Sequence, residues 1–522
     1  MRRQGRLFFF GRPGDSKAHR LNAEDLSLRI AIIGGGIAGL ACAYELELAR
    51  RAGGSVEYEL FEAGSRLGGV ISSAVVNGTV IERGPDSFLT EKPAAAQLCR
   101  ELGLGPDLVG SNDPERKTFI LIRNRLVALP DGLMFLIPTK LLPTLLTPLF
   151  SLATKVRMGL ELLHPPRPHS GDESVAALVR RHYGQEMVDR LADPLLSGIY
   201  GGDAEQLSAQ AVLPRLVDME ATHGSLTRGM LAGMRARKAA AGDGEDAAPP
   251  PIFTTLRFGL QQMIDALVAR LDGDRLHLQS PVTGIEQDIE QAGDGWRVSA
   301  AGSSGKFDAV VVATPAWAAA DLLRSVDGEL SGDLSCGLSG ELGQIPYSSS
   351  ITVNLVYEGA DLDPLPPGFG FLVPAVEKRA ILACTFIHRK FPGRTSPGKT
   401  VLRAFLDGAN NARLLDRPDD FITDLVRKEL RQILRITAKP ELVEVTRWPQ
   451  AMAQPAVGYK ERQRRVQARL AELPGLRLAG NAYDGIGISD CIRLGREAAK
   501  QLTATLQGLT RPDAPATVRS HR

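Results

Sequence analysis

At 522 residues, the chain is long enough for two or three domains, each with its own hydrophobic core. A hydrophobic content of 43%, a charged content of 23% and a formal net charge of +2 are ordinary for a soluble globular protein and give no overall field for nucleic acid. The five cysteines are scattered, with no pair or Cys/His cluster at metal-ligand spacing. No metal site is therefore predicted, and a reducing, cytoplasmic setting is the simplest interpretation.

The two chain ends are expected to be disordered extensions. Residues 1–27 are basic and irregular, and their apolar part, Leu7 to Phe10, is far shorter than a secretory segment. A start codon assigned too early is the alternative interpretation of this region. The tail over residues 509–522 is predicted to be disordered as well.

The first ordered segment has the pattern of a dinucleotide-binding unit. An apolar run from Leu28 to Ile33 leads into a glycine turn, an alanine-rich amphipathic stretch, and a second apolar run that ends at Glu62. This strand–turn–helix–strand order predicts a Rossmann-type βαβ unit. The turn residues expected to meet the cofactor are Gly34, Gly36, Ile37, Ala38 and Gly39.

Each part of this unit has a physical task. The glycines allow a tight turn, close approach to a pyrophosphate, and close packing of helix on strand. The helix N-terminus supplies amide groups for phosphate, and Glu62 is placed to accept the ribose hydroxyls. An acid at this position disfavours a 2′-phosphate, so NADP is not expected.

The segment after Glu62 favours FAD over NAD. It predicts a second close approach to a bound anion, through Ala63, Arg66, Gly68 and Gly69. Arg66 is expected to form charge-assisted hydrogen bonds to the FAD pyrophosphate. The alternative is an ordinary glycine turn with a solvated arginine.

The middle of the chain is less regular. A turn cluster spans Glu82 to Phe88, and residues 123–162 are apolar but broken by four prolines. Three interpretations of 123–162 stay open: a helical wall around an apolar substrate pocket, a surface that enters a membrane interface, or a buried helical core. Further helices are expected over 172–183 and 185–195, and a flexible insertion over 235–251.

The chain then returns twice to the nucleotide-binding sheet. A fully apolar run from Asp308 to Ala313 suits the centre of a parallel sheet, and a last strand ends at Gly480. The glycine-rich turn from Asp484 to Asp490 opens a final helix, whose N-terminus is expected to point at the cofactor. Ordinary capping by Ser489 or Asp490 is compatible with this.

This ordered set of motifs resembles the bacterial oxygen-dependent porphyrinogen oxidases, which belong to the amine-oxidase-like FAD superfamily. The resemblance runs from about Leu28 to Leu506, and its more specific pieces lie in the middle of the chain. They are Glu82–Phe88, Asp193–Asp203, His223–Leu226 and Arg447–Met452. The sequence departs from the family pattern over Met452–Tyr459, so the pocket role of that stretch is open.

The resemblance implies an α/β fold with three parts. A discontinuous Rossmann-type FAD-binding domain would comprise residues 28–85, 270–320 and 470–508. A mixed-sheet substrate domain would comprise residues 86–118, 204–269 and 321–469. A helical domain over residues 119–203 would face either the substrate or a membrane.

The resemblance also implies further cofactor contacts. They are Gly84, Pro85, Asp86, Ser87, Val282, Trp448, Ile486, Gly487 and Ile488. Lys92 is a candidate partner for a substrate propionate, with a solvated lysine as the alternative. No catalytic acid or base is identified, and FAD itself would carry the chemistry.

The implied reaction is a six-electron oxidation of a porphyrinogen by oxygen in haem biosynthesis, which releases hydrogen peroxide. Coproporphyrinogen III is the favoured substrate, and protoporphyrinogen IX is the alternative. The competing hypotheses for the function are another FAD amine oxidase, a desaturase and a non-catalytic tetrapyrrole carrier. Ferrochelatase, the next enzyme of the pathway, is an expected partner. The expected location is the cytoplasm, with peripheral contact on the inner face of the membrane left open.

Overall fold

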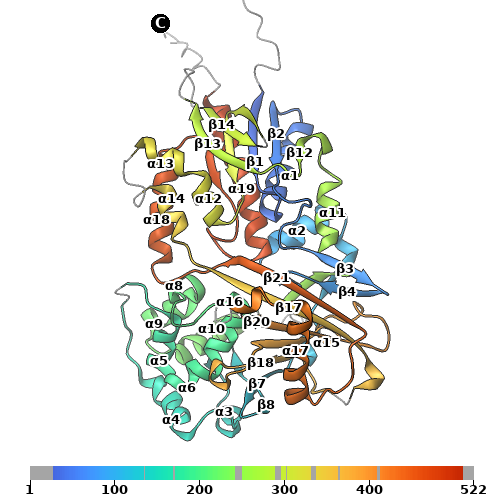
Figure 1. Cartoon of the computed structure of the whole chain (residues 1–522). Coiled ribbons are helices and arrows are strands. Elements are labelled where there is room, and N and C mark those ends of the chain that lie inside the picture. The colour runs from blue at the N-terminus through green and yellow to red at the C-terminus, as the bar shows by residue number, and fades with distance from the viewer. Residues whose placement is uncertain are drawn as a thin grey trace, which may run out of the picture.

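The computed structural model describes residues 27–134, 136–168, 171–241, 250–288, 295–300, 302–330, 337–362, 365–407 and 412–509. The chain ends that were predicted to be disordered lie outside these ranges, apart from residues 27 and 509. Of the insertion predicted over residues 235–251, residues 242–249 lie outside these ranges, whereas residues 235–241 belong to a helix. Figure 1 shows a parallel sheet with its helices at one end of the molecule, a second sheet in the middle, and a group of helices at the other end.

The first sheet is parallel and has five strands in the order β12-β2-β1-β16-β22. These strands are β1 (Leu28–Ile33), β2 (Val56–Phe61), β12 (Leu276–His277), β16 (Ala309–Val312) and β22 (Leu476–Leu478). The apolar run predicted for the sheet centre is β16, which pairs with β1 on one side and β22 on the other. The predicted Rossmann-type α/β fold is confirmed.

Alternate side chains of β1 are buried on opposite faces of this sheet. Ile30 and Ile32 pack toward α1 (Ile37–Arg51) and α19 (Ile488–Leu509), together with α2 (Pro93–Glu101) and α11 (Gln261–Val268). Ala31 and Ile33 pack on the opposite side. That side is covered by β13 (Val282–Asp288), β14 (Gly295–Ala300), β15 (Ser303–Phe307), α12 (Ala316–Leu322), α14 (Leu338–Gly343) and α18 (Tyr459–Ala471). A strand buried on both faces explains why its residues are almost all apolar.

The second sheet is mixed and has seven strands in the order β21-β17-β20-β19-β18-β7-β8. They are β7 (Thr118–Ile122), β8 (Arg125–Ala128), β17 (Tyr347–Glu358), β18 (Gly370–Leu372), β19 (Ala383–Phe386), β20 (Lys399–Asp407) and β21 (Leu442–Ala453). Strands β18 and β7 pair in parallel, whereas the other pairings are antiparallel. Helix α17 (Asp419–Leu434) covers one face through Ile422, Val426 and Leu430, which share one helical stripe.

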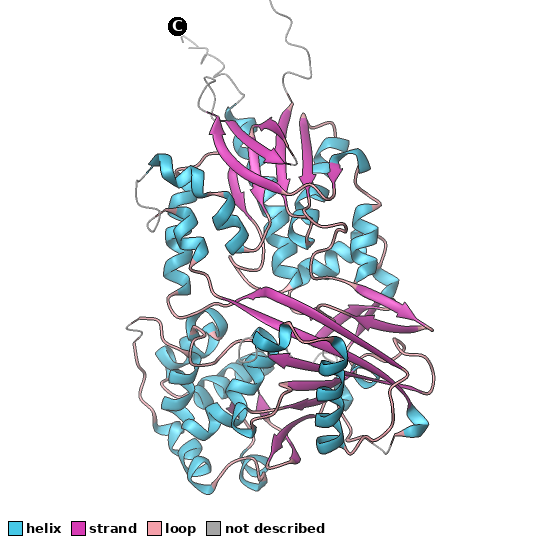
Figure 2. Cartoon of the chain, in the orientation of Figure 1, coloured by secondary structure: helices cyan, strands magenta, loops and turns pink. Residues whose placement is uncertain are grey.

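The helical unit lies at the other end of the molecule and has its own core (Figures 1 and 2). It comprises α3 (Leu141–Leu146), α4 (Leu152–Leu160), α5 (Val175–Tyr183), α6 (Gln185–Met187), a π-helical turn (Val188–Ala192), α7 (Asp193–Tyr200), α8 (Ala209–Val212), α9 (Pro214–His223) and α10 (Leu226–Ala241). Within the described residues, none of the helices has the length and apolar character needed to cross a membrane.

Short elements connect these parts. They are β3 (Ser73–Val76), β4 (Thr79–Glu82), β5 (Phe88–Leu89), β6 (Leu108–Gly110), β9 (Leu133–Met134), β10 (Ile137–Pro138), β11 (Phe253–Leu256), α13 (Arg324–Leu330), α15 (Ile387–Lys390) and α16 (Ala412–Leu415). Strand β4 leads directly into the turn cluster after Glu82.

The structure differs from the sequence-based expectation over residues 119–128. This range was assigned to a helical domain, but it contains most of β7 and all of β8, which form a hairpin at the edge of the mixed sheet. Arg123 and Asn124 at its tip have φ values of +47° and +62°, as a two-residue hairpin turn requires. The helices also continue beyond residue 203, as far as α10.

Candidate active site

The first candidate cofactor contact is the turn between β1 and α1. Gly34 has a φ of +108°, and a Cβ there would lie 2.8 Å from the carbonyl oxygen of Ala313. A Cβ on Gly39 would lie 1.9 Å from the carbonyl oxygen of Gly34. Gly36, the N-cap of α1, supplies no side-chain cap and has open space at its Cβ position. The amides of residues 37–38 therefore begin the helix beside an open cradle, which fits a phosphate group.

Glu62 joins this turn to the second glycine motif. Its Oε2 accepts a hydrogen bond from the amide of Gly35 (2.7 Å), and its Oε1 accepts one from the amide of Gly64 (2.7 Å). The amide of Gly68 donates to the carbonyl of Gly35 (2.8 Å), and a Cβ on Gly69 would lie 3.2 Å from the Cα of Gly36. The predicted glycine residues and Glu62 are thus together at the carboxyl edge of the parallel sheet.

Arg66 lies beside this cradle and is surrounded by backbone carbonyls. It donates to the carbonyl oxygens of Ile71 (3.1 Å) and Leu67 (3.3 Å) and also to that of Gly69. Burial and the neighbouring Arg83 lower the pKa of the Arg66 guanidinium. Arg83 is paired with Glu444, whereas Arg66 has no carboxylate partner among the described residues, so Arg66 is the cation left for a pyrophosphate. The contact of Arg66 with FAD itself stays a prediction.

The loop after β4 is held by side chains of the mixed sheet. Thr352 Oγ1 and Trp448 Nε1 donate to the carbonyl of Arg83 (3.0 and 2.8 Å), and Asn354 Nδ2 donates to the carbonyl of Glu82 (2.9 Å). The second sheet therefore fixes the backbone of the loop that the sequence assigns to the cofactor.

Gly84 continues this contact. Arg403 Nη2 donates to its carbonyl oxygen, and a Cβ at this position would lie 1.7 Å from the carbonyl oxygen of Val70. Only glycine fits between the two loops without moving the backbone.

Asp86, two residues later, is engaged by protein cations. Lys390 Nζ lies 3.1 and 2.9 Å from its two carboxylate oxygens, and Ser87 Oγ donates to Oδ1 (2.6 Å). Burial alone would raise the pKa of Asp86, but Lys390 and Arg403 hold it below its ordinary value. The carboxylate is ionised and points to protein partners, so the backbone of residues 84–87 is the part left to meet a cofactor.

Buried charges lie immediately behind this loop. Glu82 and Arg394 form an ion pair in which both side chains are almost fully buried. Burial raises the pKa of Glu82, while Arg394 opposes that shift. The Nε atoms of Arg394 and Arg403 and Nη1 of Arg394 have no hydrogen-bond partner within the described part of the chain. Such donors require water or a ligand atom, which is compatible with a polar pocket beside the loop.

The last predicted motif begins α19. Gly485 has a φ of +101°, and a Cβ there would lie 2.4 Å from Cγ of Asp490. Asp490 Oδ2 accepts a hydrogen bond from the amide of Gly487 (3.2 Å), whereas Ile486 is half-buried and Ile488 packs into the core. The carboxylate of Asp490 thus organises the turn that the sequence assigns to FAD.

Helices α1 and α19 approach the same edge of the sheet. Their preceding strands β1 and β22 lie on either side of β16 and run parallel to it. A Cβ on Gly495 would lie 2.1 Å from the carbonyl oxygen of Ala38, so the first turn of α1 touches α19 about two turns after that helix begins. The N-terminal parts of α1 and α19 therefore lie beside each other at the carboxyl edge, and each helix N-terminus favours negative charge. That the N-terminus of α19 points at the cofactor stays a prediction.

The remaining predicted residues lie around this edge. Val282 is a half-buried residue at the start of β13, and Trp448 is half-buried on β21. Lys92 is paired with Asp490 rather than free in solvent. Within the described ranges, no group of three metal-ligating side chains could hold a metal ion.

Helix α7, which carries the motif Asp193–Asp203, reaches the same region. Its last carbonyl, that of Tyr200, accepts hydrogen bonds from Gln454 Nε2 (2.7 Å) and Ser348 Oγ (3.4 Å). Burial and the charge of Asp490 raise the pKa of Tyr200. Ile199, beside it, is 43% exposed although it is apolar. The end of α7 is therefore a candidate wall for an apolar substrate.

The motif His223–Leu226 has a structural role. Glu161, fully buried, accepts hydrogen bonds from Ser225 Oγ (2.8 Å) and the amide of Leu226 (2.6 Å), which begin α10. His182 bridges Glu161 (3.0 Å) and Glu220 (3.1 Å) through its two ring nitrogens. This network belongs to the helical unit and not to the cofactor edge.

The sequence analysis missed the cations and polar side chains that hold the cofactor loop: Thr352, Asn354, Lys390, Arg394 and Arg403. One signal was present, because Thr352 and Asn354 alternate with buried Ile351, Val353 and Leu355 on β17. Alternating polar residues in an otherwise apolar strand indicate a face that contacts a polar partner. Lys390 and Arg403 carried no local signal.

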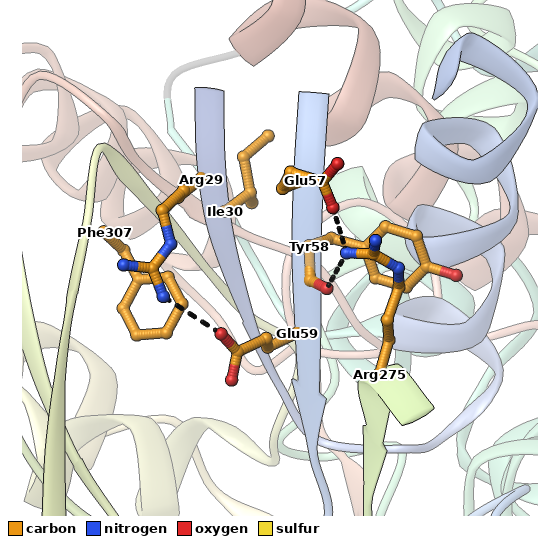
Figure 3. Close-up of a pocket in the computed structure, with 7 residues that line it drawn as sticks. All are labelled: Arg29, Ile30, Glu57, Tyr58, Glu59, Arg275 and Phe307. Atoms are coloured by element: carbon orange, nitrogen blue, oxygen red, sulfur yellow. Dashed lines mark hydrogen bonds and ion pairs between the residues drawn. The ribbon is translucent and has the colours of Figure 1, made fainter. Parts of the chain in front are cut away.

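A cavity of about 150 Å³ lies at the other edge of the parallel sheet (Figure 3). Its charged lining forms ion pairs across it, Arg29 with Glu59 (3.1 Å) and Arg275 with Glu57. These residues lie near the amino ends of β1 and β2, whereas the glycine motifs follow the carboxyl ends. The cavity is not part of the candidate active site.

Comparison with known proteins gives a consistent result. The family model described as flavin containing amine oxidoreductase matches residues 37–503. The coproporphyrinogen III oxidase of Bacillus subtilis is 33% identical over 91% of this chain and 98% of its own. The chloroplastic protoporphyrinogen oxidase 1 of Spinacia oleracea is 30% identical over 91% and 84%. A crystal structure from Exiguobacterium sp. 255-15 has a TM-score of 0.78 and 32% identity, covering 92% of this chain and 99% of that chain.

Proposed function

The chain belongs to the flavin-containing amine oxidoreductase family and is an FAD-dependent oxidoreductase, and from this premise we propose that it oxidises coproporphyrinogen III to coproporphyrin III in haem biosynthesis. The observation that carries the proposal is the end-to-end similarity to a curated coproporphyrinogen III oxidase, which covers 98% of that protein. Similarity over a whole chain includes the substrate-facing parts as well as the cofactor motifs.

In the proposed reaction, one porphyrinogen loses six electrons and six hydrogens, and three molecules of oxygen become three of hydrogen peroxide. Bound FAD would accept two electrons in each of three rounds and pass them to oxygen. The protein's part is to hold the cofactor through the glycine turns and to fix the loop at residues 82–87. Helix N-termini at the cofactor edge would also favour the negative charge that develops when the cofactor is reduced.

The two candidate substrates differ in charge. Coproporphyrinogen III has two more propionates than protoporphyrinogen IX, so its pocket needs more cationic or polar partners. Relatives of both kinds align along the chain, with 33% identity to the coproporphyrinogen enzyme and 30% to the protoporphyrinogen enzyme. Oxidation of protoporphyrinogen IX is therefore the alternative within the same chemistry.

We also propose how the chain is divided. Residues 28–85, 270–320 and 470–508 would form the FAD-binding domain, together with α2, α11, α14 and α18, which pack on the parallel sheet. The mixed sheet would carry the substrate side. The helical domain would begin at α3 and extend to α10, because β7 and β8 are part of the mixed sheet.

A peripheral membrane contact on the cytoplasmic face is a further part of the proposal. Helices α3 and α4 and the residues after them expose large apolar side chains: Leu142, Leu145, Leu146, Leu152, Val156, Leu160 and Leu163. Lys140 and Arg157 are exposed in the same region, whereas the nearby Glu161 is fully buried. An apolar surface with cations suits an anionic lipid interface. Ferrochelatase stays a predicted partner.

The test is oxygen-dependent porphyrin fluorescence. FAD-loaded protein receives coproporphyrinogen III or protoporphyrinogen IX, with a reaction lacking enzyme as the control for autoxidation. We expect faster porphyrin formation from coproporphyrinogen III, with three hydrogen peroxide molecules per porphyrin. Preference for protoporphyrinogen IX would support the alternative substrate. No enzyme-dependent rate with either would favour another amine oxidase, a desaturase or a tetrapyrrole carrier.

A further inference from the structure

The N-termini of α2 and α19 are joined by an ion pair between residues nearly 400 positions apart. Lys92 is the N-cap of α2, and Asp490 lies in the first turn of α19. Lys92 Nζ lies 2.9 Å from Oδ1 and 2.7 Å from Oδ2 of Asp490. The Lys92 side chain is 42% exposed and that of Asp490 only 9%, so a largely buried carboxylate has a cation at its open side.

The backbone reinforces this pair. Ser489 Oγ donates to the carbonyl of Lys92 (3.0 Å) and accepts from the amide of Ala95 (3.4 Å). Ser489 thus caps α2 from α19, since α2 has no side-chain cap of its own. Asp490 also accepts from the amide of Gly487, which belongs to the turn assigned to the cofactor. Lys92, Asp490 and this turn therefore form one connected unit.

The negative charge of Asp490 counteracts the attraction that a helix N-terminus has for an anion. A carboxylate in the first turn favours the helix, but it also places negative charge at the N-terminus of α19, beside the turn assigned to an electron-accepting, phosphate-bearing cofactor. Its field reaches neighbouring groups: burial and then Asp490 raise the pKa of the Cys491 thiol, whereas Lys92 lowers it. Lys92 thus offsets the Asp490 charge at this edge.

We infer that Lys92 is a positioning residue of the cofactor site, which neutralises Asp490 and holds the turn at residues 485–487 for FAD. In this role it does not bind a substrate propionate, which was the expectation from the sequence. The inference concerns FAD alone and does not depend on which porphyrinogen is oxidised.

Two measurements without substrate test the inference: the dissociation constant of FAD from reconstituted apoprotein, and the two-electron reduction potential of bound FAD. Lys92→Met is expected to weaken FAD binding about fivefold, the upper range for a partly exposed ion pair, and to lower the potential. Lys92→Arg retains the cation and should keep wild-type values.

The double variant Lys92→Met/Asp490→Asn distinguishes charge compensation from simple loss of packing. Because it removes both charges, its potential should return toward the wild-type value, whereas Lys92→Met alone should not recover. Asp490→Asn alone can still accept the hydrogen bond from Gly487, and it should raise the potential.

The opposite pattern would overturn the inference. If Lys92 held a propionate, Lys92→Met would raise KM for coproporphyrinogen III, leave the potential and FAD affinity unchanged, and gain nothing from Asp490→Asn. Potential and FAD affinity that are the same in wild type, Lys92→Met and the double variant would equally contradict it. Both readouts remain valid if the protein oxidises no porphyrinogen, so failure of the proposed function is recognised separately.

Discussion

Gly84 is the residue at which the cofactor loop has the least room. A Cβ there would lie 1.7 Å from the backbone oxygen of Val70, while its own carbonyl accepts from the buried Arg403. Both neighbours are held in place, so a methyl group can be accommodated only by moving the loop.

We therefore predict that Gly84→Ala purifies with little FAD and loses about 1–3 kcal/mol of stability, the range for an overpacked site. The measurements are the flavin-to-protein absorbance ratio and the urea midpoint. Gly233→Ala is the matched control, because, apart from its own helix backbone and chain neighbours, the described residues place no atom within 4 Å of a Cβ at Gly233 on α10. A Gly84→Ala protein with full FAD content and wild-type stability would contradict this account of the loop.

The Asp86–Lys390 pair gives a second prediction at this scale, namely a contribution to stability that depends on pH. Both side chains are nearly nine-tenths buried, so Lys390→Met leaves a buried carboxylate without its cation and should cost about 3–5 kcal/mol at pH 7. Because Lys390 and Arg403 lower the folded-state pKa of Asp86, the wild-type carboxylate contributes stability above its ordinary pKa, near 4. That contribution is lost as the pH falls further, toward the folded-state pKa.

Urea unfolding of wild type and Lys390→Met between pH 7 and pH 3 measures this effect. The stability difference between the two proteins should be largest near neutral pH and should shrink on acidification, because protonation of Asp86 in the variant removes its uncompensated buried charge. A difference that stays constant over this range would show that Lys390 contributes packing alone.

At the scale of elements, the N-terminus of α10 is held by hydrogen bonds to a side chain from another segment. Glu161 accepts from Ser225 and the amide of Leu226 and also bonds to His182. We predict that Glu161→Ala destabilises the helical unit by about 2–4 kcal/mol, because it leaves these buried donors without an acceptor. FAD affinity should stay unchanged, since no cofactor motif contacts the network.

Limited proteolysis and FAD titration of the same samples separate these two outcomes. Glu205→Gln is the control, because Glu205 forms an exposed ion pair with Arg180 in the same unit. If Glu161→Ala loses FAD as readily as it becomes sensitive to protease, the helical unit and the cofactor site are not independent.

The elements differ in how well the sequence predicts them. The βαβ unit, β16 and the turn before α19 follow from local patterns, namely apolar runs beside glycine turns, and all appear where expected. The hairpin of β7 and β8 was missed, because its apolar residues were grouped with the proline-broken helices that follow. Its Arg123–Asn124 turn lacks the glycine that usually marks such a tip.

The partners in the candidate site were harder to predict for a different reason. Glu62 acts on glycines close to it in sequence, whereas Asp86 meets Lys390 and Lys92 meets Asp490 across 304 and 398 positions. Such pairs depend on how whole sheets pack, and no local pattern determines them. The sequence alone therefore left Lys92 between a substrate partner and a solvated side chain.

On the scale of the whole molecule, α3 and α4, which expose large apolar side chains, lie at the end farthest from the parallel sheet, whereas the cofactor edge of that sheet faces the mixed sheet in the middle (Figure 1). We predict that the protein binds vesicles containing phosphatidylglycerol more strongly than pure phosphatidylcholine, and that salt weakens this binding. The variant Leu146→Glu/Leu152→Glu should lose most of the binding and keep its FAD.

Vesicle co-sedimentation measures the effect. Phe258→Glu is the control, because Phe258 is 53% exposed but lies next to α11, at the FAD-binding end of the molecule. Equal binding by wild type and the α3–α4 variant would remove this face as the membrane contact. No binding to either vesicle would remove the membrane contact from the proposal.

The strand order of the parallel sheet also has a consequence for biosynthesis. Strand β1 starts at Leu28, but β16, beside it in the sheet, and β22, at the edge, follow about 280 and 450 residues later, and α19 comes last of all. A ribosome makes the N-terminal βαβ unit early, yet the edge that receives the flavin is complete only when almost the whole chain has been made. Flavin loading is therefore expected after translation, and until then the apolar strand β1 depends on chaperones or on its early helix for protection.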